Sequence, residues 1–579
     1  MPKVTFNGGK FSVEAEQGET LLSCIRRSGL KAESTCGGRG VCGKCRVSAH
    51  GELSPPDEIE RKLLEGQEDK VRLACRAKVA GDIAVTLSDS WTRLQSASAF
   101  GLREVALESP VKRVVLPEKD SSAVPYAETL PFRLRDPQLL DKIAGWDANS
   151  NHASAILFGD EAIDVRFDGK PVLGAAVDVG TTGLSLCLFD LDTGETIGCS
   201  SALNPQTAYG GDVITRIEYC RRERDGLSVL RLALIQELGA MLDQTLGQNL
   251  GRDQVYLMSA AGNSTMLHIL AGVNPLSLAL APFRPAFLKP LVLDAQRFGL
   301  PIAPQGRLVL LPGAAAYVGA DIIAGLTAID YRSAPPCTLF IDIGTNGEIV
   351  LIEGPDRLVA TSCAMGPALE GMNISCGCRA VPGAIDSVTV GDDGELRFTT
   401  IGALPPIGIC GSGLVDLVAA LLCTGAVAPG GAFTTGAGRF SDRLRGDRYF
   451  LTENVFISQK DIRQVQLAKG AAITAILTLL GEAGRSVSDL QQITVAGSFG
   501  YHLNPESLKR IGLLPQDYSG PVAFVGNSSL SGAALVVRSQ EMLRDMERLA
   551  SIIRVVELGA HPDFSRRFIS MLDFPALRR

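Results

Sequence analysis

The chain has 579 residues, 46% of them hydrophobic and 21% charged, which is the composition of a globular protein with several domains. Its formal net charge of −7 and the lack of any Lys/Arg stripe exclude the basic surface typical of nucleic-acid-binding proteins. The N-terminal sequence has no apolar secretory segment, and no apolar run reaches the ~18 residues of a membrane span, so we expect a cytoplasmic protein. The longest apolar helical stretch, residues 471–480, is expected to lie buried in a core.

Residues 1–90 are expected to form one domain. An Asn-Gly-Gly turn between two short runs predicts a hairpin over residues 4–13, because this turn sequence favours paired strands. Thr20 is a suitable N-cap for a helix that ends at Gly29. A Gly- and Cys-rich loop follows at residues 35–45, and an alternating run near the end of the unit predicts a closing strand.

Four cysteines of this unit have the spacing of an iron–sulfur site. Cys36, Cys42 and Cys45 are separated by five and two residues, and 29 residues then precede Cys75. In 2Fe–2S ferredoxins one loop supplies three thiolates and a distant strand supplies the fourth, and the first gap of five resembles ferredoxins of the adrenodoxin type. A structural zinc site would need a second close pair, which Cys75 lacks. We therefore predict that these four cysteines hold a 2Fe–2S cluster.

The other ten cysteines are scattered and do not indicate a disulfide framework, because disulfides are rare in cytosolic proteins. Cys24, inside the first helix, is expected to be a packing residue rather than a fifth ligand. Two thiols separated by a single residue chelate metals poorly. We therefore interpret a later group of cysteines as packing residues as well: Cys363, Cys376, Cys378 and Cys410.

Residues 91–126 are expected to be a linker, because Ser-Ala repeats and a Pro-bounded stretch interrupt the hydrophobic pattern. Residues 127–170 are expected to form a small middle domain with one helix and two strands, to which the sequence assigns no role. The pattern then changes to alternating strands and helices, which predicts an α/β domain over residues 171–579.

Two aspartate motifs mark an internal repeat in this α/β region. Asp-Val-Gly-Thr-Thr-Gly begins at Asp178, at the end of an apolar strand, and Asp-Ile-Gly-Thr-Asn-Gly begins at Asp342 in the same setting. The two aspartates are 164 residues apart. A repeat of that size predicts two similar lobes facing each other rather than a solenoid of short units.

The aspartate motifs have the chemistry of phosphate and magnesium binding. Their glycines allow a tight turn whose N–H groups can cradle phosphate, and a carboxylate at a strand end can hold hydrated Mg²⁺. One such motif is weak evidence because D-x-G-T is also a plain turn, but two copies in matching settings strengthen the interpretation. The chain has no G-x-x-x-x-G-K-[ST] sequence, so it is not a P-loop protein.

Three further Gly-rich loops, at residues 262–266, 408–413 and 495–500, have the composition of turns that line a cleft. The last of them follows an apolar strand and could take adenosine. A plain strand-to-helix turn is the alternative for each loop. Hydrolase motifs do not occur: the five histidines form no HExxH pair, and there is no Ser-centred G-x-S-x-G elbow.

These motifs together resemble the reductive activators of corrinoid proteins, which join an N-terminal 2Fe–2S domain to an ATPase of the actin, sugar-kinase and heat-shock-protein superfamily. The resemblance covers nearly the whole chain, and only residues 132–168 match loosely. Besides the cysteines, aspartate motifs and Gly-rich loops, it rests on Asn204-Pro-Gln, Gly211-Asp and Gly366-Pro-Ala-Leu-Glu-Gly371. Relatives in methylamine metabolism carry C-terminal 4Fe–4S motifs, whereas this chain has no cysteine after Cys423 and resembles the 2Fe–2S type.

The resemblance implies a multi-domain fold of α+β and α/β type: a β-grasp ferredoxin domain, a linker, a small middle domain and a two-lobed, actin-like, ribonuclease-H-like ATPase. It implies ATP-dependent return of one electron to inactive cobalt(II) of a corrinoid methyltransfer protein, giving active cobalt(I). The implied cofactors are a 2Fe–2S cluster, ATP and Mg²⁺. The implied partners are the corrinoid protein and an upstream electron donor, and the chain itself is expected to form a homodimer. Neither nucleic acid nor membrane is expected as a partner.

The resemblance also implies roles for individual residues. Asp178 and Asp342 would hold Mg²⁺ or position water. Gly497 and Ser498 would contact adenosine. The residues implied to hold phosphates or to line the cleft are Gly180, Thr181, Thr182, Gly344, Thr345, Asn346, Gly411 and Ser412.

Three other functions remain as alternatives. An electron donor of the 2-hydroxyacyl-CoA dehydratase type would share the ATPase fold, but would place a 4Fe–4S cluster between subunits and lack the N-terminal ferredoxin. A small-molecule kinase with an attached redox domain would transfer the γ-phosphate to an added hydroxyl or carboxyl compound. A non-enzymatic interaction module would bind ATP without hydrolysing it.

Overall fold

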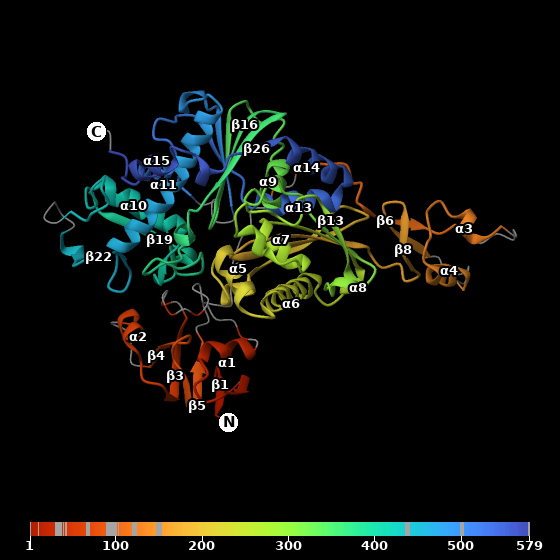
Figure 1. Ribbon diagram of the computed structural model, residues 1–579, viewed down its shortest axis with the longest axis horizontal. Coiled ribbons are helices and arrows are strands. Elements are labelled where there is room, and N and C mark those ends of the chain that lie inside the picture. Colours follow the sequence, from red (N-terminus) through yellow and green to blue (C-terminus); the bar gives the residue numbers. More distant parts are fainter. Residues whose placement is uncertain are drawn as a thin grey trace.

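A computed structural model of the chain describes residues 2–9, 11–28, 30, 38, 40, 43, 45–64, 70–87, 101, 103–117, 124–145, 153–434, 441–497 and 503–576. Figure 1 shows an N-terminal domain (red) below a central body that contains two large sheets. A small three-stranded sheet (orange) projects from the side of that body, away from the N-terminal domain.

The N-terminal domain is a mixed five-stranded sheet covered by a helix. Its elements are β1 (Lys3–Phe6), β2 (Phe11–Glu14), α1 (Leu21–Arg27), β3 (Arg46–Leu53), α2 (Glu58–Leu63), β4 (Val71–Leu73) and β5 (Val79–Thr86). The hairpin predicted for residues 4–13 is confirmed, and β1 also pairs in parallel with β5, which is the β-grasp arrangement. Thr20 caps α1 as predicted, because its hydroxyl accepts a hydrogen bond from the Ser23 backbone N–H at 3.3 Å.

A buried ion pair fixes the end of this sheet just before Cys75. The Arg72 guanidinium donates to both carboxylate oxygens of Glu60 at 3.0 Å, and the Leu73 backbone N–H donates to the same carboxylate at 2.7 Å. Both side chains of the pair are buried, at 9% and 1% exposure. The pair therefore holds α2 against β4 and sets the position of the turn that carries Cys75.

Replacing Glu60 by Ala should destabilise this domain by about 3–5 kcal/mol, because the Arg72 charge would remain buried without a partner. Urea unfolding followed by the visible absorption of the cluster measures the effect on this domain alone. Glu58→Ala is the matched control, since Glu58 is exposed on the same helix. Equal unfolding midpoints for the two variants would show that the buried pair does not stabilise the domain.

The small sheet consists of β6 (Val111–Val115), β7 (Ser154–Phe158) and β8 (Glu161–Arg166), with α3 (Tyr126–Thr129) and α4 (Pro137–Ala144) beside it. The helix and two strands expected for residues 127–170 are present. Residues 91–126, expected to be a linker, also contribute a strand, because β6 pairs antiparallel with β7. Lys112 and Arg113 break the apolar pattern of β6, so its sequence did not indicate a strand.

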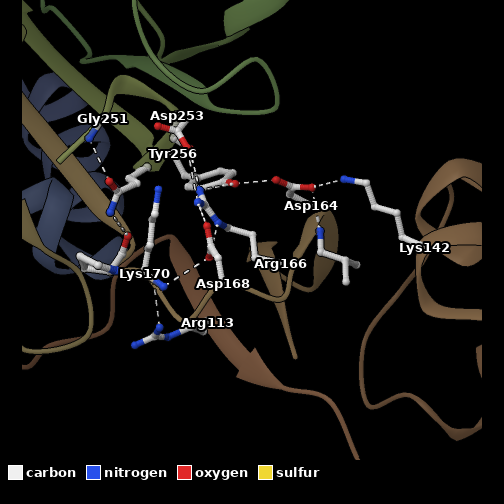
Figure 2. A network of polar contacts seen from close by, with 12 residues as sticks. Arg113, Lys142, Asp164, Arg166, Asp168, Lys170, Gly251, Asp253 and Tyr256 are labelled. Carbon is white, nitrogen blue, oxygen red and sulfur yellow. Dashed lines mark hydrogen bonds and ion pairs between the residues drawn. The ribbon is translucent and has the colours of Figure 1, made fainter. Parts of the chain in front are cut away.

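A polar network joins this sheet to the central body (Figure 2). Arg166, at the end of β8, donates to the Asp253 backbone carbonyl at 2.8 Å and to the Tyr256 hydroxyl at 3.3 Å. Tyr256, on β12 (Val255–Gly262), donates in turn to Asp164, which also accepts from Lys142 at 2.8 Å. The small sheet is thus fixed to the start of β12, an interior strand of the first large sheet.

The first large sheet has the strand order β11-β10-β9-β12-β14-β13. Its strands besides β12 are β9 (Leu173–Val179), β10 (Gly183–Asp190), β11 (Thr196–Leu203), β13 (Leu291–Asp294) and β14 (Arg307–Leu310). Helices cover it on both faces (Figure 1). The helices in this part of the chain are η2 (Pro205–Ala208), α5 (Val213–Arg222), α6 (Gly226–Leu246), η3 (Arg252–Gln254), α7 (Ser264–Ala271), η4 (Pro275–Leu278), α8 (Ala295–Phe298) and α9 (Ala320–Ala328).

The second large sheet has the strand order β25-β24-β15-β16-β17-β26. Its strands are β15 (Thr338–Ile343), β16 (Gly347–Gly354), β17 (Arg357–Cys363), β24 (Gln492–Ala496), β25 (Val522–Phe524) and β26 (Ile553–Val555). The helices of this lobe are η5 (Pro367–Glu370), α10 (Gly411–Cys423), α11 (Gln459–Glu482), η8 (Val487–Asp489), α12 (Pro505–Ile511), α13 (Ser528–Arg538), α14 (Gln540–Ile552), η10 (Leu558–Ala560) and α15 (Phe564–Ser570).

Two small sheets extend the second lobe. One has the order β19-β18-β20, and the other β21-β22-β23. Their elements are β18 (Ala384–Val390), β19 (Leu396–Thr400), η6 (Ile401–Ala403), β20 (Gly408–Ile409), η7 (Ser441–Arg443), β21 (Leu444–Arg445), β22 (Arg448–Phe450) and β23 (Phe456–Ser458). The first of these sheets packs against α10, whose first residues line the cavity between the lobes.

The two large sheets have the same topology around their aspartates, as the repeat predicts. In each, the strand that ends in the aspartate motif forms a hairpin with the next strand and pairs in parallel with a later one. Asp178 is therefore beside Ala261 on β12, and Asp342 is beside Ala496 on β24. Helix α13 packs against α9 and β9, so the C-terminal region also forms part of the first lobe's core.

Helix α11 is the one helix in the described part of the chain that is long and apolar enough to cross a membrane by length and composition alone. It contains the apolar stretch 471–480. Most of that stretch is buried in the core of the second lobe, between its main sheet and α15. This placement is the one expected from the sequence.

Cys187 on β10 and Cys199 on β11 form a disulfide. The sequence did not predict this pair, because the ten cysteines outside the cluster motif are scattered and gave no sign of disulfide pairing. The two strands run antiparallel, and the register sets the two residues directly opposite each other, with their Cα atoms 4.1 Å apart. A separation of 12 residues in the sequence gives no local signal of that pairing.

Candidate functional site

A cavity of about 260 Å³ lies where the two lobes meet, with Asp178 on one side and Asp342 on the other. Each aspartate is next to last on its strand, β9 or β15, so parallel topology brings both to corresponding ends of the two sheets. Ser498 lies outside the described residues. The other cleft residues expected from the sequence all line this cavity: Gly180, Thr181, Thr182, Gly344, Thr345, Asn346, Gly411, Ser412 and Gly497.

The two aspartate motifs form matching hairpin turns that approach each other across the cavity. A Cβ atom on Gly180 would lie 2.6 Å from the Gly183 carbonyl oxygen, so this turn requires glycine. In the second lobe, the Gly344 backbone N–H donates to the Asn346 carbonyl at 3.0 Å. The hydroxyls of Thr182 and Thr345 are 3.5 Å apart. The polar edges of both turns therefore face one shared space.

Asp178 is held by the N-terminus of α13. The Asn527 side-chain amide donates to one carboxylate oxygen at 2.9 Å, and the Ser529 hydroxyl donates to the other at 2.8 Å. Asn527 also caps the helix by accepting from the Leu530 backbone N–H at 2.9 Å. Sequence reasoning missed both partners, although Asn527 before an apolar helical pattern is a recognisable N-cap.

Three further carboxylates line the cavity and were missed from the sequence: Asp321 in the first turn of α9, Glu348 on β16 and Glu370 in η5. Glu348 directly follows the second aspartate motif and lies opposite Asp342 in the sheet register. Glu370 accepts from the Thr345 hydroxyl at 2.7 Å. Asp321 had no motif that could have indicated its place.

Crowding and burial make this group of carboxylates hard to ionise together. Burial, with Asp321 and Asp178 nearby, raises the pKa of Asp342 to about 8. Burial and the Asp178 charge raise the pKa of Asp321 to about 7. Burial raises the pKa of Asp178, and burial with the neighbouring carboxylates raises that of Glu348. A cation in the cavity would relieve this repulsion.

The carboxylates fit a hydrated magnesium ion rather than an all-protein metal cage. In the described part of the chain, no three Asp, Glu, His or Cys side chains converge on one point closely enough to hold a metal themselves. Mg²⁺ keeps several waters and binds through one or two carboxylates together with substrate phosphates. Asp178 and Asp342 are thus suitable for a metal that arrives with a nucleotide.

The raised pKa values predict that metal-free protein loses stability as the pH rises. The folded state binds these protons more tightly than the unfolded chain, whose carboxyl pKa values are about 4, so stability falls between about pH 4 and pH 8. Each extra bound proton contributes about 1.4 kcal/mol per pH unit. Calorimetry in EDTA should show a falling Tm from pH 5.5 to 8, and Asp342→Asn should flatten the slope. A rising Tm over that range would contradict the account.

The turn at Gly180 is supported from behind by the segment that contains Asn204. The Asn204 side chain donates to the Gly180 carbonyl at 2.8 Å, and its backbone N–H donates to the Thr182 carbonyl at 2.9 Å. Arg216 on α5 is fully buried and donates to the Thr181 carbonyl and to Gln206. This explains structurally the Asn-Pro-Gln motif, whose role the sequence left open.

The same segment contacts the N-terminal domain. Arg26 on α1 donates to the Ala208 carbonyl, and its guanidinium lies 4.8 Å from the centre of the Tyr209 ring. Tyr209 in turn packs against Tyr219 on α5, with ring centres 5.1 Å apart. The short segment from Asn204 to Tyr209 therefore contacts both the turn at Gly180 and the N-terminal domain.

Two of the four predicted cluster ligands lie together in the N-terminal domain. The sulfurs of Cys45 and Cys75 are 3.3 Å apart, close enough for both to bind one iron. The Ala74 backbone N–H donates to the Cys45 carbonyl at 2.8 Å and holds the two turns together. Cys36 and Cys42 lie outside the described residues. The two described thiols fit the predicted 2Fe–2S site.

The later cysteines lie in or beside the second lobe's core. Cys363 is buried in the main core, and burial raises the pKa of its thiol. Cys410 and Cys378 pack in a smaller apolar group, and Cys410 also lines the cavity next to Gly411. These positions are those of packing residues, as interpreted from the sequence.

The fold and these two sites define a class: an actin-like ATPase that carries a 2Fe–2S ferredoxin domain on the same chain. Residues 336–579 match the C-terminal domain of RACo, described as the ASKHA domain, and residues 173–333 match the RACo middle region. Residues 4–80 match the 2Fe-2S iron-sulfur cluster binding domain.

Individual relatives agree with that class. The chain is 31% identical to the corrinoid activation enzyme RamQ of Eubacterium limosum, over 95% of each chain. It is 26% identical to the Co(II) methylated amine-specific corrinoid protein reductase of Methanosarcina barkeri, over 66% of this chain and 72% of that protein. A solved reductive activator for corrinoid, iron-sulfur protein matches with a TM-score of 0.73 at 28% identity, covering 99% of this chain and 98% of that one. The chain belongs to the family of reductive activators of corrinoid proteins.

Proposed function

We propose that this chain is an ATP-dependent reductive activator that returns one electron to the inactive cobalt(II) of a corrinoid methyltransfer protein, giving active cobalt(I). One observation carries the proposal: a single chain holds a paired-thiol site and an interlobe carboxylate cavity, and residues 204–209 contact both parts of the molecule. Two relatives are named for work on corrinoid proteins: a corrinoid activation enzyme that matches 95% of this chain and a Co(II) corrinoid protein reductase that matches 66% of it.

The energy balance explains why such a reaction needs ATP. Cobalt(II) in a corrinoid protein is hard to reduce, and each ~59 mV of one-electron deficit costs about 1.4 kcal/mol. A gap of a few hundred millivolts therefore requires on the order of 5–7 kcal/mol, which hydrolysis of ATP to ADP and phosphate can supply. The ATPase domain needs only to bind the corrinoid protein more tightly in one nucleotide state than in the other, so that the complex in which the electron is transferred is favoured in that state.

Each group of residues has a defined part in this proposal. When bound by Cys36, Cys42, Cys45 and Cys75, the 2Fe–2S cluster supplies the single electron. Asp178 and Asp342 hold Mg²⁺ or position the attacking water. The adenosine contacts are assigned to Gly497 and Ser498. The phosphate contacts are assigned to the two turns and the start of α10: Gly180, Thr181, Thr182, Gly344, Thr345, Asn346, Gly411 and Ser412.

The proposal extends to partners and location. Since each turnover removes one electron from the chain, an upstream electron donor must restore it. We propose a homodimer, as the family resemblance implies, and light scattering would then give twice the chain mass of 61.2 kDa. We propose a cytoplasmic location, because the apolar residues of helix α11 are buried in the core of the second lobe rather than available to insert into a membrane.

Phosphate release distinguishes this function from that of a small-molecule kinase. An activator should hydrolyse ATP to inorganic phosphate, and a cognate corrinoid protein should stimulate the rate. The measurement is phosphate release with and without a panel of corrinoid proteins, alongside a panel of sugars and carboxylic acids. Transfer of the γ-phosphate to one of those small molecules would overturn the proposal.

A further inference from the structure

We propose that Arg379 contacts the terminal phosphate of ATP and so makes the interlobe cavity selective for ATP over ADP. The inference rests on the proposed nucleotide site, but not on the identity of the electron acceptor. It concerns a residue that no motif indicated. Arg379 lies in the second lobe, between the end of η5 and the first strand of a small sheet, β18.

Arg379 is the single cationic side chain among the described residues that line the cavity. Five carboxylates line the same space: Asp178, Asp321, Asp342, Glu348 and Glu370. A polyanionic nucleotide could not enter a cavity of that charge without cations. Magnesium supplies one positive group, and Arg379 is placed to supply the other.

The Arg379 guanidinium has an unused donor in a buried position. Its Nη2 atom is buried and makes no hydrogen bond within the described part of the chain. Although five carboxylates share the cavity, the structure records no ion pair between Arg379 and any described carboxylate. Burying a guanidinium nitrogen without an acceptor is costly, so this arrangement is suited to an anion that comes from outside.

The main chain around Arg379 is fixed, so its side chain extends from a rigid wall. The Cys378 backbone N–H donates to the Ile409 carbonyl at 2.9 Å, and the Val381 N–H donates to the Arg379 carbonyl at 2.9 Å. Ile409 is the last residue of β20 and is fully buried. Two residues later, Gly411 and Ser412 begin α10 and line the same cavity. Arg379 and this helix start therefore share one wall.

A phosphate fits this position better than another anion class. A guanidinium presents a planar fork of donors that matches two phosphate oxygens, whereas an ammonium acts as a point charge. The N–H groups at the start of a 13-residue helix favour the same negative charge. Because ADP lacks the terminal phosphate, the contact would exist only with ATP. Such a contact gives the two nucleotide states different affinities, as an ATP-driven cycle requires.

Nucleotide binding to the intact, cluster-loaded protein tests the inference directly. Arg379→Ala should weaken Mg·ATP binding on the order of 30-fold, as expected when one partner of a buried charged pair is removed, and should change Mg·ADP binding less than about threefold. Arg379→Lys should recover part of the loss, because it keeps the charge but not the fork. Displacement of a fluorescent ADP analogue by each unlabelled nucleotide measures both affinities.

The matched control is Arg397→Ala. Arg397 lies on β19 in the same small sheet, is exposed, and pairs with Asp393 at 2.8 Å. The Arg397→Ala variant should bind Mg·ATP and Mg·ADP with the same affinities as the wild type. Arg379→Gln, with a thermal melt and the visible cluster spectrum as folding checks, separates loss of contact from misfolding.

The Arg379→Ala variant would overturn the inference if it weakened ATP and ADP binding equally, or if it weakened neither. A wild-type protein that fails to bind ATP would overturn it as well. If wild type prefers ATP, Arg379→Ala removes the preference, and no corrinoid protein is reduced, then the nucleotide contact stands and only the proposed function fails.

Discussion

Asp178→Asn is expected to reduce ATP-dependent cobalt reduction on the order of 100-fold or more, while leaving the 2Fe–2S spectrum unchanged. The substitution keeps the size of the side chain but removes the carboxylate charge that a metal ion requires. Asn527 and Ser529 both donate to this carboxylate, so the side chain cannot easily move to compensate. The measurement is the initial rate of cobalt(I) formation, followed by visible absorption under anaerobic conditions.

Asp392→Asn is the matched control for this prediction. Asp392 is an exposed carboxylate in the turn between β18 and β19 and does not line the cavity. It should retain the wild-type rate. If Asp178→Asn instead lost its cluster absorption, the separation of the thiol site from the carboxylate cavity would be wrong.

Cys75→Ser is expected to abolish the normal 2Fe–2S signal and, with it, cobalt reduction. A serine oxygen replaces the thiolate, and the Cys75 sulfur lies 3.3 Å from that of Cys45, where both can bind one iron. The ATPase lobes should be unaffected, so ATP binding is retained. Electron paramagnetic resonance of the anaerobically reduced protein measures the cluster, and nucleotide titration measures the second site.

Cys24→Ala serves as the control for the cysteine prediction. Cys24 is fully buried in α1 and packs in the core of the same domain. Its loss costs some packing but removes no ligand, so the signal should remain. An unchanged signal in Cys75→Ser would exclude Cys75 as a ligand and would require a different fourth residue.

The features that could be predicted from the sequence are those that depend on short local motifs. The spacing of Cys45 and Cys75 with the loop before them indicated a cluster, and the motifs at Asp178 and Asp342 indicated two facing turns. The aspartate motifs could be recognised because each lies within one strand–turn unit, and the cysteines could be recognised from the spacing of three of them in a single loop. The β-grasp hairpin and the N-cap Thr20 could be read for the same reason.

The remaining parts of the site could not be read from the sequence because tertiary packing assembles them. Asp321 lies in the first turn of a helix and Arg379 lies in a connection, and neither has a motif. Glu370 lies in a short 3-10 turn, and the Gly-Pro-Ala-Leu-Glu-Gly sequence around it did not indicate a role for its carboxylate. Only the closing of the two lobes brings them to one cavity. The Cys187–Cys199 pair depends in the same way on the register of two strands.

A comparison of nucleotide states tests whether ATP drives electron delivery to cobalt. The anaerobically reduced protein is mixed with a cognate cobalt(II) corrinoid protein, with Mg·ATP, with Mg·ADP or with no nucleotide, and cobalt(I) is followed by visible absorption. Substantial cobalt(I) is expected only in the mixture that contains Mg·ATP. Equal conversion without ATP would contradict the proposed role of ATP.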